Sequence, residues 1–309
     1  MKIVVTGATG VIRRRLLPLL IEAGHDVTAV VHSPAKAGAI VRKGVTVVAP
    51  DLFDRALLFP LMVGKDAVVN LATHIPSSSL AMFLPGAWRE NDRIRRIASA
   101  NLVDAALEGG VQHFIQESFA FAYPDQGERW IDESVAFAPS RHSRSVVDAE
   151  HAALRFAGGG AAGIILRFGA FYGPDAMQVH EMVKYLHKGY AVLPGAAHAF
   201  ISSVSHDDAA SAVVAALGLQ SGAYNVVDDE PLRHREFFDT LAAALGLEPP
   251  TLPPSWVGTL MGSIGEAMAR SLRISNRKLR ENSAWRPRYP SVREGWPATI
   301  AAFETQRAA

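Results

Sequence analysis

The sequence predicts an α/β fold: a doubly wound parallel sheet with helices on both faces and a smaller C-terminal lobe. Three observations predict it. Apolar runs that do not alternate with polar residues, such as "KIVVT", "AVVNLA" and "IILRFG", are separated by amphipathic segments. A glycine-rich turn, "TGATG", follows the first of these runs. After Tyr172 the alternation breaks down, and prolines cluster in "EPPTLPP".

The elements follow one another in a regular order up to this break. Runs such as "DVTAVVH", "VTVVA" and "HFIQES" complete a sheet that we expect to hold about six or seven strands. Ligands of such sheets lie beyond the carboxyl ends of the strands, so the lobe is expected to close over that edge. Helices are expected after the glycine turn, near Ala35–Arg42, and over Arg55–Met62, Trp88–Glu108, Ser145–Ala157, Asp207–Leu217 and Arg235–Leu245.

Composition excludes several classes of function. The 309 residues carry a net charge of +1, which gives no argument for nucleic acid or an acidic membrane as partner. The chain has no cysteine, which excludes disulfides, thiolate nucleophiles and zinc–thiolate sites and fits a cytoplasmic protein. The apolar stretch Trp256–Met268 is too short for a membrane span, which needs about 20 residues. We expect a small-molecule substrate and no metal, and leave a homodimer open.

One basic segment needs an explanation. Residues 270–293 contain seven arginines and Lys278 against a single acid, Glu281. A run of this kind is usually a solvated or lobe-packing surface. The alternative is a site for an anionic substrate.

The glycine turn is one of several motifs that occur in a fixed order. "TGATGVI" is followed by "DLFD", "NLATHIP", "LRFGAFYGP", "HDDAASAVVAAL" and "GAYNVVDDEPL". Together these motifs resemble the extended short-chain dehydrogenase/reductase family, the NAD-dependent epimerase/dehydratase group, over essentially the whole chain. The resemblance implies a Rossmann-like dinucleotide-binding domain over 1–172 and a substrate lobe over 173–309, segments of which can return to the sheet.

The resemblance also implies which residues hold the cofactor. Beyond the second strand the family uses an acid to bind the ribose of NAD, but this chain has His32, Ser33 and Lys36 there, with Arg14 nearby. Cations favour the 2′-phosphate of NADP, so any dinucleotide bound is expected to be NADP. The implied contacts are Gly7, Thr9, Gly10, Val11 and Ile12 to the pyrophosphate, Asp51 and Leu52 to the adenine, and Leu71, Ala72 and Thr73 along the cofactor.

Arg13 is the first departure from the family pattern, because it occupies the position of the third glycine. Its side chain could turn outward, as Arg14 and Arg15 are expected to do. It could form an ion pair with the pyrophosphate, for which Arg is well suited. It could also fill the phosphate site, and the protein would then bind no cofactor.

The second departure concerns the catalytic pair of the family, a tyrosine followed four residues later by lysine. None of the six tyrosines has this spacing. Aligning Ser145 and the Ala149–Glu150 pair of "PSRHSRSVVDAE" with the family segment puts His142 at the tyrosine position and Val146 at the lysine position. The pair is therefore absent, and His142 becomes the leading candidate acid or base.

Two further candidates lie in "FIQESFAFAY". The catalytic Ser or Thr of the family falls on Phe119 in this register, with Ser118 one residue early and Glu117 at the end of the same strand. Together with His142 they could form an acid/base set. Each also has a structural explanation: a solvated loop for His142, a turn cap for Ser118 and an arginine pair for Glu117. The family pattern also puts His74, Phe168, Phe171 and Tyr172 at the substrate cleft, although packing explains the aromatics equally well.

Three functions follow from these observations. The first is an NADP-dependent oxidoreductase with a substituted catalytic acid. The second, which the two departures favour, is an enzyme of the same fold that performs non-redox acid/base chemistry, such as an elimination, isomerisation or cyclisation, on a small organic metabolite. The third is a non-enzymatic NADP-binding sensor or scaffold.

Overall fold

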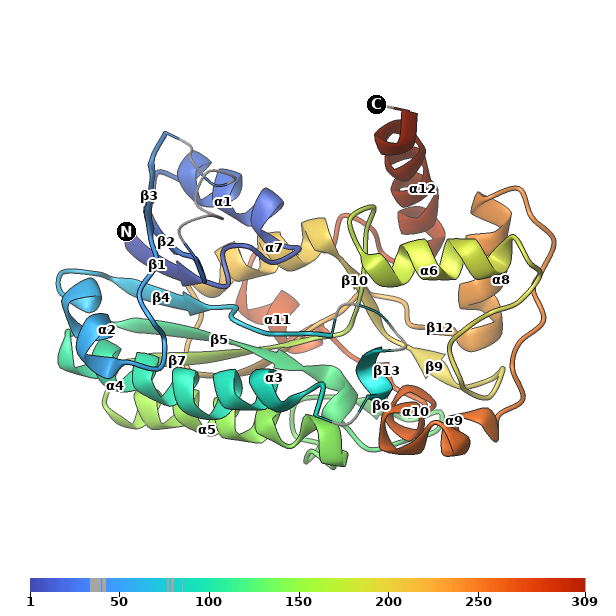
Figure 1. Cartoon of the computed structure of the whole chain (residues 1–309), viewed down its shortest axis with the longest axis horizontal. Coiled ribbons are helices and arrows are strands. Elements are labelled where there is room, and N and C mark those ends of the chain that lie inside the picture. Colours follow the sequence, from blue (N-terminus) through green and yellow to red (C-terminus); the bar gives the residue numbers. More distant parts are fainter. Residues whose placement is uncertain (34–39, 41–42, 77, 79–80, 85, 309) are drawn as a thin grey trace.

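The computed structural model describes residues 1–33, 40, 43–76, 78, 81–84 and 86–308. Its centre is a parallel sheet of seven strands in the order β11-β7-β5-β4-β1-β2-β3 (Figure 1). This order reverses direction between β1 and β4, which is where open α/β sheets bind their ligands. The strands are β1 (Lys2–Thr6), β2 (Asp26–Val30), β3 (Val45–Val48), β4 (Ala67–Asn70), β5 (His113–Phe119), β7 (Ala162–Phe168) and β11 (Gly222–Val226).

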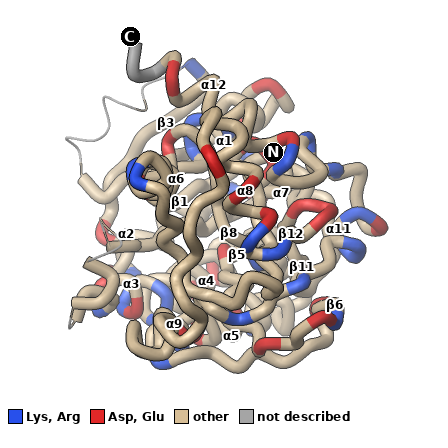
Figure 2. Tube along the Cα trace, turned by 90° about the vertical axis from the view of Figure 1, so that its right-hand side faces the viewer, with Lys and Arg blue, Asp and Glu red and all other residues tan. Residues whose placement is uncertain are grey.

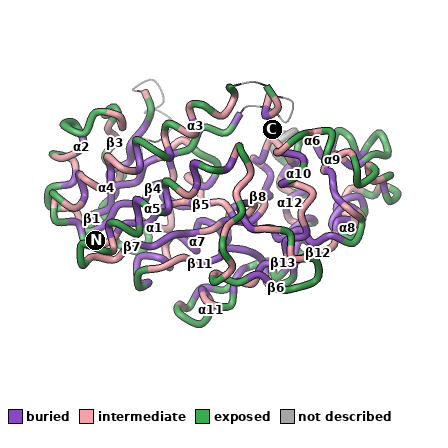
Figure 3. Tube along the Cα trace, turned by 90° about the horizontal axis from the view of Figure 1, so that it is seen from below, coloured by how far each residue is buried: buried purple, intermediate pink, exposed green. Residues whose placement is uncertain are grey.

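Helices cover both faces of the sheet, as the sequence predicts. One face packs against α1 (Arg13–Glu22) and α7 (His206–Ala216), and the other against α2 (Arg55–Met62), α4 (Ser99–Glu108) and α5 (Ser145–Gly158). The strands between them are largely buried (Figure 3). Apart from the buried Ile40, the helix expected near Ala35–Arg42 lies outside the described residues.

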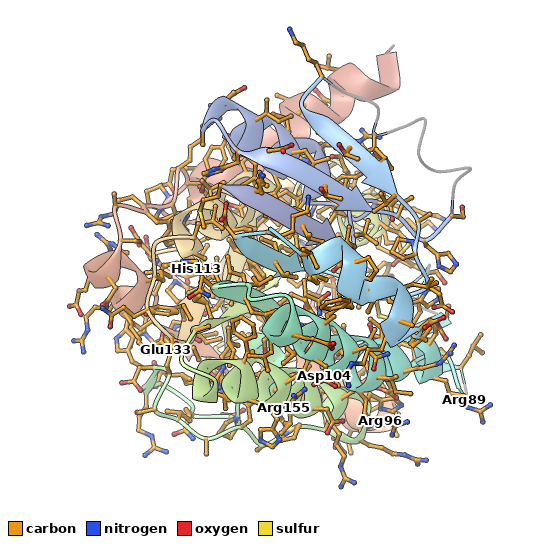
Figure 4. All side chains as sticks on the ribbon, turned by 90° about the vertical axis from the view of Figure 1, so that its left-hand side faces the viewer. Arg89, Arg96, Asp104, His113, Glu133 and Arg155 are labelled. Atoms are coloured by element: carbon orange, nitrogen blue, oxygen red, sulfur yellow. The ribbon has the colours of Figure 1, made fainter. Side chains whose placement is uncertain are left out.

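The long helix expected over Trp88–Glu108 is interrupted by a different winding. It consists of α3 (Arg89–Arg93), a five-residue π-helical turn η3 (Ile94–Ala98) and α4. After the π-helical turn, Asp104 of α4 forms an ion pair with Arg155 of the neighbouring helix α5, and the two side chains point toward each other (Figure 4).

The second lobe has its own core, built from α6 (Met177–Leu186), α8 (His234–Ala244) and α12 (Val292–Ala308). The second half of the chain also returns to the sheet, because β11 pairs with β7 and α7 packs against α1. The remaining elements are η2 (Ala81–Phe83), η4 (Ala120–Ala122), β6 (Trp130–Ile131), η5 (Arg141–Ser143), β8 (Ala170–Tyr172), β9 (Phe200–Ile201), β10 (Ser203–Ser205), β12 (Leu232–Arg233), α9 (Val257–Leu260), α10 (Gly262–Met268), β13 (Arg273–Ile274) and α11 (Arg277–Asn282). No helix in the described part of the chain is long and apolar enough to cross a membrane.

Asn70 holds the carboxyl ends of the central strands together. It accepts a hydrogen bond from Thr6 Oγ1 of β1 (2.5 Å) and donates to Gln116 of β5 (2.8 Å) and to Ser99 of α4 (3.1 Å). All four side chains are buried, so each needs its hydrogen-bond partner inside the protein. This network fixes the edge of the sheet from which the glycine turn and the loop after β4 emerge.

The basic segment 270–293 is used for structure. Arg270 donates to the carbonyls of Phe121 and Tyr123, which ties the lobe to the segment after β5. Arg280 pairs with Asp229, and Arg293 pairs with Glu230. Along this part of the trace basic and acidic residues lie close together (Figure 2). These contacts support the lobe-packing explanation of the run.

His234 is a buried histidine that makes the stability of the fold depend on pH. Its ring packs against Gly195, where an added Cβ would lie 2.5 Å from Cε1, and its Nε2 has no partner among the described residues. Burial lowers the pKa of His234 from 6.5 to about 4. Between these values the unfolded chain binds a proton that the folded protein does not, so His234 destabilises the fold as the pH falls.

We expect this effect to disappear in His234→Gln. Urea unfolding of the parent and the variant should show the parent losing about 1.4 kcal/mol more per pH unit as the pH falls from 6.5 toward 4. The exposed His187→Gln is the matched control and should follow the parent. Parallel pH profiles for the parent and His234→Gln would contradict the assignment.

Candidate functional site

The turn between β1 and α1 has the geometry that a pyrophosphate needs. Gly7 has a φ of +66°, and an added Cβ there would lie 2.3 Å from the carbonyl oxygen of Leu71. The turn is closed by a hydrogen bond from the Gly10 amide to the Gly7 carbonyl (2.8 Å). No described residue accepts a hydrogen bond from the amides of Thr9, Val11 or Ile12. Amides at the start of a helix bind phosphate, so these residues fit a dinucleotide.

The three consecutive arginines of α1 have different environments. Arg13 is half-buried as the first residue of the helix. Arg14 is exposed and lies 3.7 Å from Asp175. The expectation that Arg15 points outward is wrong, because it pairs with Asp175 (2.8 Å) and with Asp207 at the start of α7. Both carboxylates belong to the second half of the chain and draw the Arg15 side chain inward. The ion pair with Asp207 joins α1 to α7.

The expected adenosine end of the site lies at the neighbouring strands. His32 is exposed and Ser33 is half-buried directly after β2, with no acid at the strand end. Asp51 is exposed, and one of its carboxylate oxygens accepts the amide of Phe53 (2.9 Å). The companion residue Lys36 lies outside the described residues. The remaining predicted contacts on the loop after β4 are half-buried Leu71, buried Ala72 and exposed Thr73, and Leu52 is half-buried after β3.

His142, which the sequence alignment predicts at the tyrosine position of the family, lies on η5, immediately before α5. Its Nδ1 is 2.6 Å from the hydroxyl of Ser263 on α10, so the lobe fixes one nitrogen of the ring. Val146, which the same alignment predicts at the lysine position, is completely buried in α5. No cation therefore stands at this position to assist a phenol or an imidazole.

Ser118 belongs to a different set of contacts. It is 1% exposed, and its hydroxyl donates to Glu150 on α5 (2.5 Å). Glu150 also pairs with Arg167 of β7 (2.7 Å), and Arg167 donates to the Tyr123 hydroxyl (2.7 Å). Burial raises the pKa of Tyr123 to about 12, so this tyrosine stays protonated. The Tyr123 hydroxyl in turn donates to Asn225 of β11 (2.9 Å).

Glu117 is paired with Arg95 on the π-helical turn η3. Arg95 Nε and Nη2 lie 3.0 and 2.9 Å from the same carboxylate oxygen. The arginine side chain is 5% exposed and that of the glutamate 12% exposed. The arginine-pair explanation of Glu117 is therefore confirmed, and no described contact joins Glu117, Ser118 and His142 to one another.

Aromatic residues surround this end of the sheet. Phe119, which the sequence register predicts at the family's Ser or Thr position, stacks on Phe121 with ring centroids 4.8 Å apart. Phe168 and Tyr172 are buried in two hydrophobic clusters, and Phe171 is half-buried between Phe168 and a histidine ring. His74 is exposed, and its amide donates to the buried Asn91 (2.9 Å).

Sequence reasoning missed Arg95 and Ser263. Both are far along the chain from their partners, by 22 and 121 residues. Arg95 lies in an arginine-rich stretch whose sequence is typical of a solvated helix face. Its place on the π-helical turn, which sets it apart from the neighbouring arginines, is known only from the structure. A lone serine in a glycine-rich segment carries no signal.

Comparison with known proteins identifies the family. A model of the NAD(P)H-binding family matches residues 7–218. A Streptomyces protein named 3-diazoavenalumate denitrifying reductase is 32% identical over 306 residues, covering 96% of this chain and 99% of that protein. An NAD(P)H azoreductase of Xenophilus azovorans is 30% identical over 135 residues, 43% of this chain and 41% of that enzyme.

Solved structures support the fold. A human epimerase family protein with NADPH superposes with a TM-score of 0.82 at 21% identity, over 97% of this chain and 99% of that one. A UDP-glucose 4-epimerase of Thermotoga maritima with UDP-glucose superposes with a TM-score of 0.78 at 20% identity, over 99% of each chain. These likenesses and the ordered motifs confirm the extended short-chain dehydrogenase/reductase fold. The chain is a member of the NAD(P)H-binding family, built on an epimerase-like fold.

Proposed function

We propose that this protein is a reductase that uses NADPH to reduce an electrophile with a nitrogen–nitrogen multiple bond, an aryl diazonium ion being the acceptor that fits the site best. The observation that carries the proposal is the chemistry of the three family positions. They hold Phe119, His142 and the buried Val146 in place of a hydroxyl, a phenol and a lysine.

The chemical argument rests on where protons are needed. Hydride addition to a carbonyl leaves an alkoxide, which requires a positioned acid. Reduction of an aryl diazonium ion requires none in its net reaction. The new C–H bond is made from the hydride, and the electron pair of the broken C–N bond leaves with dinitrogen. The reduced nicotinamide, when bound, supplies the hydride, and the protein has to hold and shield the two reactants.

The names of two relatives agree with this acceptor class. The Streptomyces reductase has a diazo group in the name of its substrate, and the Xenophilus enzyme is named for azo compounds. Both groups contain nitrogen–nitrogen multiple bonds. The first relative matches this chain almost end to end, so it favours reduction over the non-redox chemistry that the missing tyrosine and lysine suggest by themselves.

Each part of the site then has a role. The turn from Gly7 to Ile12 would hold the pyrophosphate with those amides that have no acceptor among the described residues, and Arg13 would add a cation beside it. The half-buried Phe119 would present an apolar surface to the reacting atoms and keep water away from them, whereas Val146 is buried inside α5 and leaves the position without a charge.

A second candidate keeps the non-redox chemistry, with His142 as acid or base. The hydrogen bond between His142 Nδ1 and Ser263 favours this second candidate, because an imidazole held at one nitrogen can exchange protons at the other. The two candidates differ in what His142 is for: in the reductase it holds the lobe against α5, and in the alternative it carries the proton.

Comparison of His142→Phe with the parent separates them. We expect the parent to oxidise NADPH when an aryl diazonium salt is added, and His142→Phe to lose less than about tenfold in rate, whereas loss of a general acid or base costs about 10²–10⁴-fold. Ser263→Ala is the control, because it removes the hydrogen bond and keeps the imidazole. A loss of about a hundredfold or more in His142→Phe would overturn the reductase assignment of this residue.

Cofactor preference is a separate expectation. The absence of an acid after β2, with His32 in its place, favours NADPH over NADH. In calorimetric titration we expect the parent to bind NADPH more tightly and His32→Asp to shift the preference toward NADH. Arg13→Gly should weaken binding of both by about tenfold or more, the effect of losing a hydrogen bond to a charged group. Tighter binding in Arg13→Gly would show instead that Arg13 obstructs the phosphate site.

A further inference from the structure

A pocket of about 330 Å³ lies where the lobe meets the loop after β4. Three methionines line it: Met82 on η2, and Met261 and Met268 at the two ends of α10. Phe83 and Tyr185 add two aromatic rings. Glu181 and the aliphatic stretch 192–194 complete the described lining. We call this the methionine pocket.

Tight packing holds the walls in place. An added Cβ at Gly265 would lie 2.3 Å from the carbonyl oxygen of Gly258, so the two glycines let α9 and α10 approach closely. An added Cβ at Gly258 would in turn lie 3.0 Å from the Cβ of Ala269, directly after α10. On the opposite side the Trp88 indole donates to the carbonyl of Met82 (2.9 Å) and fixes η2. The volume is within the range of small-molecule sites, about 300–1,000 Å³.

The pocket adjoins the family's catalytic position. Ser263, which bonds the His142 ring, lies on α10 between Met261 and Met268. The wall that carries two of the methionines is therefore fastened to the start of α5. A ligand in the methionine pocket would reach toward the cleft in which the reduction is proposed to occur.

The lining selects for one chemical class. The thioether sulfur atoms of methionine make favourable contacts with aromatic rings, and the flexible side chain adapts to the shape of a ligand. The rings of Phe83 and Tyr185 can stack on an aromatic ligand. Among the described lining residues none is an arginine or a lysine, and one is an acid. A diphosphate would find no cation to pair with among these described residues, and buried anions need such pairs.

We propose that the methionine pocket binds the planar aromatic part of the acceptor and rejects nucleotide sugars. This assignment rests on the proposed reductase function for the identity of the acceptor, but ring binding itself can be measured without turnover. The pocket then decides which aryl electrophiles reach the hydride, through the shape of the ring system that it accepts.

The test uses naphthol, an uncharged planar aromatic that is not reduced, added to the full-length protein with its NADPH present. We expect its fluorescence to report saturable binding. Met268→Asp should weaken that binding by about tenfold or more, because the ring would desolvate a carboxylate. Met261→Leu, which keeps an apolar side chain of similar volume, should bind nearly as well as the parent. UDP-glucose should neither bind nor displace naphthol.

Met177→Asp is the matched control. Met177 begins α6, the helix that also supplies Tyr185, but it is outside the pocket, and an acid is favourable in the first turn of a helix. This variant should bind naphthol like the parent. Equal binding by Met268→Asp and the parent, or displacement of naphthol by UDP-glucose, would overturn the proposal. If naphthol binding depends on Met268 but the protein reduces no diazonium salt, the pocket assignment holds and the proposed reductase function is wrong.

Discussion

Gly7→Ala is expected to abolish detectable NADPH binding and to destabilise the fold by several kcal/mol. The single added carbon would lie 2.3 Å from the Leu71 carbonyl oxygen, so the loop after β4 would have to move. The residue also has a φ of +66°, which costs about 1–2 kcal/mol for a side chain other than glycine. Calorimetric titration with NADPH and urea unfolding measure the two effects.

Gly24→Ala is the matched control, because Gly24 has a φ of +78° and no atom within 4 Å of an added Cβ. Gly24→Ala should lower the free energy of unfolding only by the cost of the positive φ, about 1–2 kcal/mol, and should bind NADPH like the parent. If the two variants behaved alike, the contact between the glycine turn and Leu71 would not be what requires glycine at position 7.

Arg167→Met is expected to cost about 3–5 kcal/mol of unfolding free energy, because it leaves the buried carboxylate of Glu150 without its partner. Ser118 can still donate to that carboxylate but supplies no positive charge. The double variant Arg167→Met with Glu150→Gln should recover much of the loss, since Gln keeps an acceptor for Ser118 and carries no charge. Urea unfolding of both variants gives the comparison.

An exposed pair provides the control for this prediction. Arg277 lies 3.6 Å from Glu281, and both side chains are largely in solvent. Arg277→Met should change stability by less than about 1 kcal/mol. A loss in Arg167→Met as small as this would mean that solvent, and not Arg167, neutralises Glu150.

Most of the fold could be predicted because it depends on patterns local in the sequence. Strands 2–6 and 162–168 have continuous apolar cores, Ile3–Val5 and Ile164–Leu166, and amphipathic helices separate the strands of the sheet. The π-helical turn at 94–98 could not be predicted, because its residues suit an ordinary helix equally well. The inward turn of Arg15 depends on Asp175 and Asp207, which only the folded chain brings near.

The site divides in the same way. The glycine turn is recognisable because Gly7 and Gly10 stand at fixed spacing after a strand, and the absence of the tyrosine and lysine is visible in the residues alone. Which partner each polar side chain takes is a property of tertiary packing. Glu117 and Ser118 are adjacent in β5, yet one pairs with Arg95 and the other donates to Glu150.

The central claim is that hydride passes from NADPH to the acceptor without a positioned acid. It is tested most directly by single-turnover oxidation of NADPH with an aryl diazonium salt, comparing cofactor deuterated at the transferring carbon with unlabelled cofactor, in ordinary and in heavy water. The account predicts that deuterium in the cofactor slows the reaction and that heavy water does not. A reaction slowed only by heavy water, or product formed with no NADPH oxidised, would contradict it.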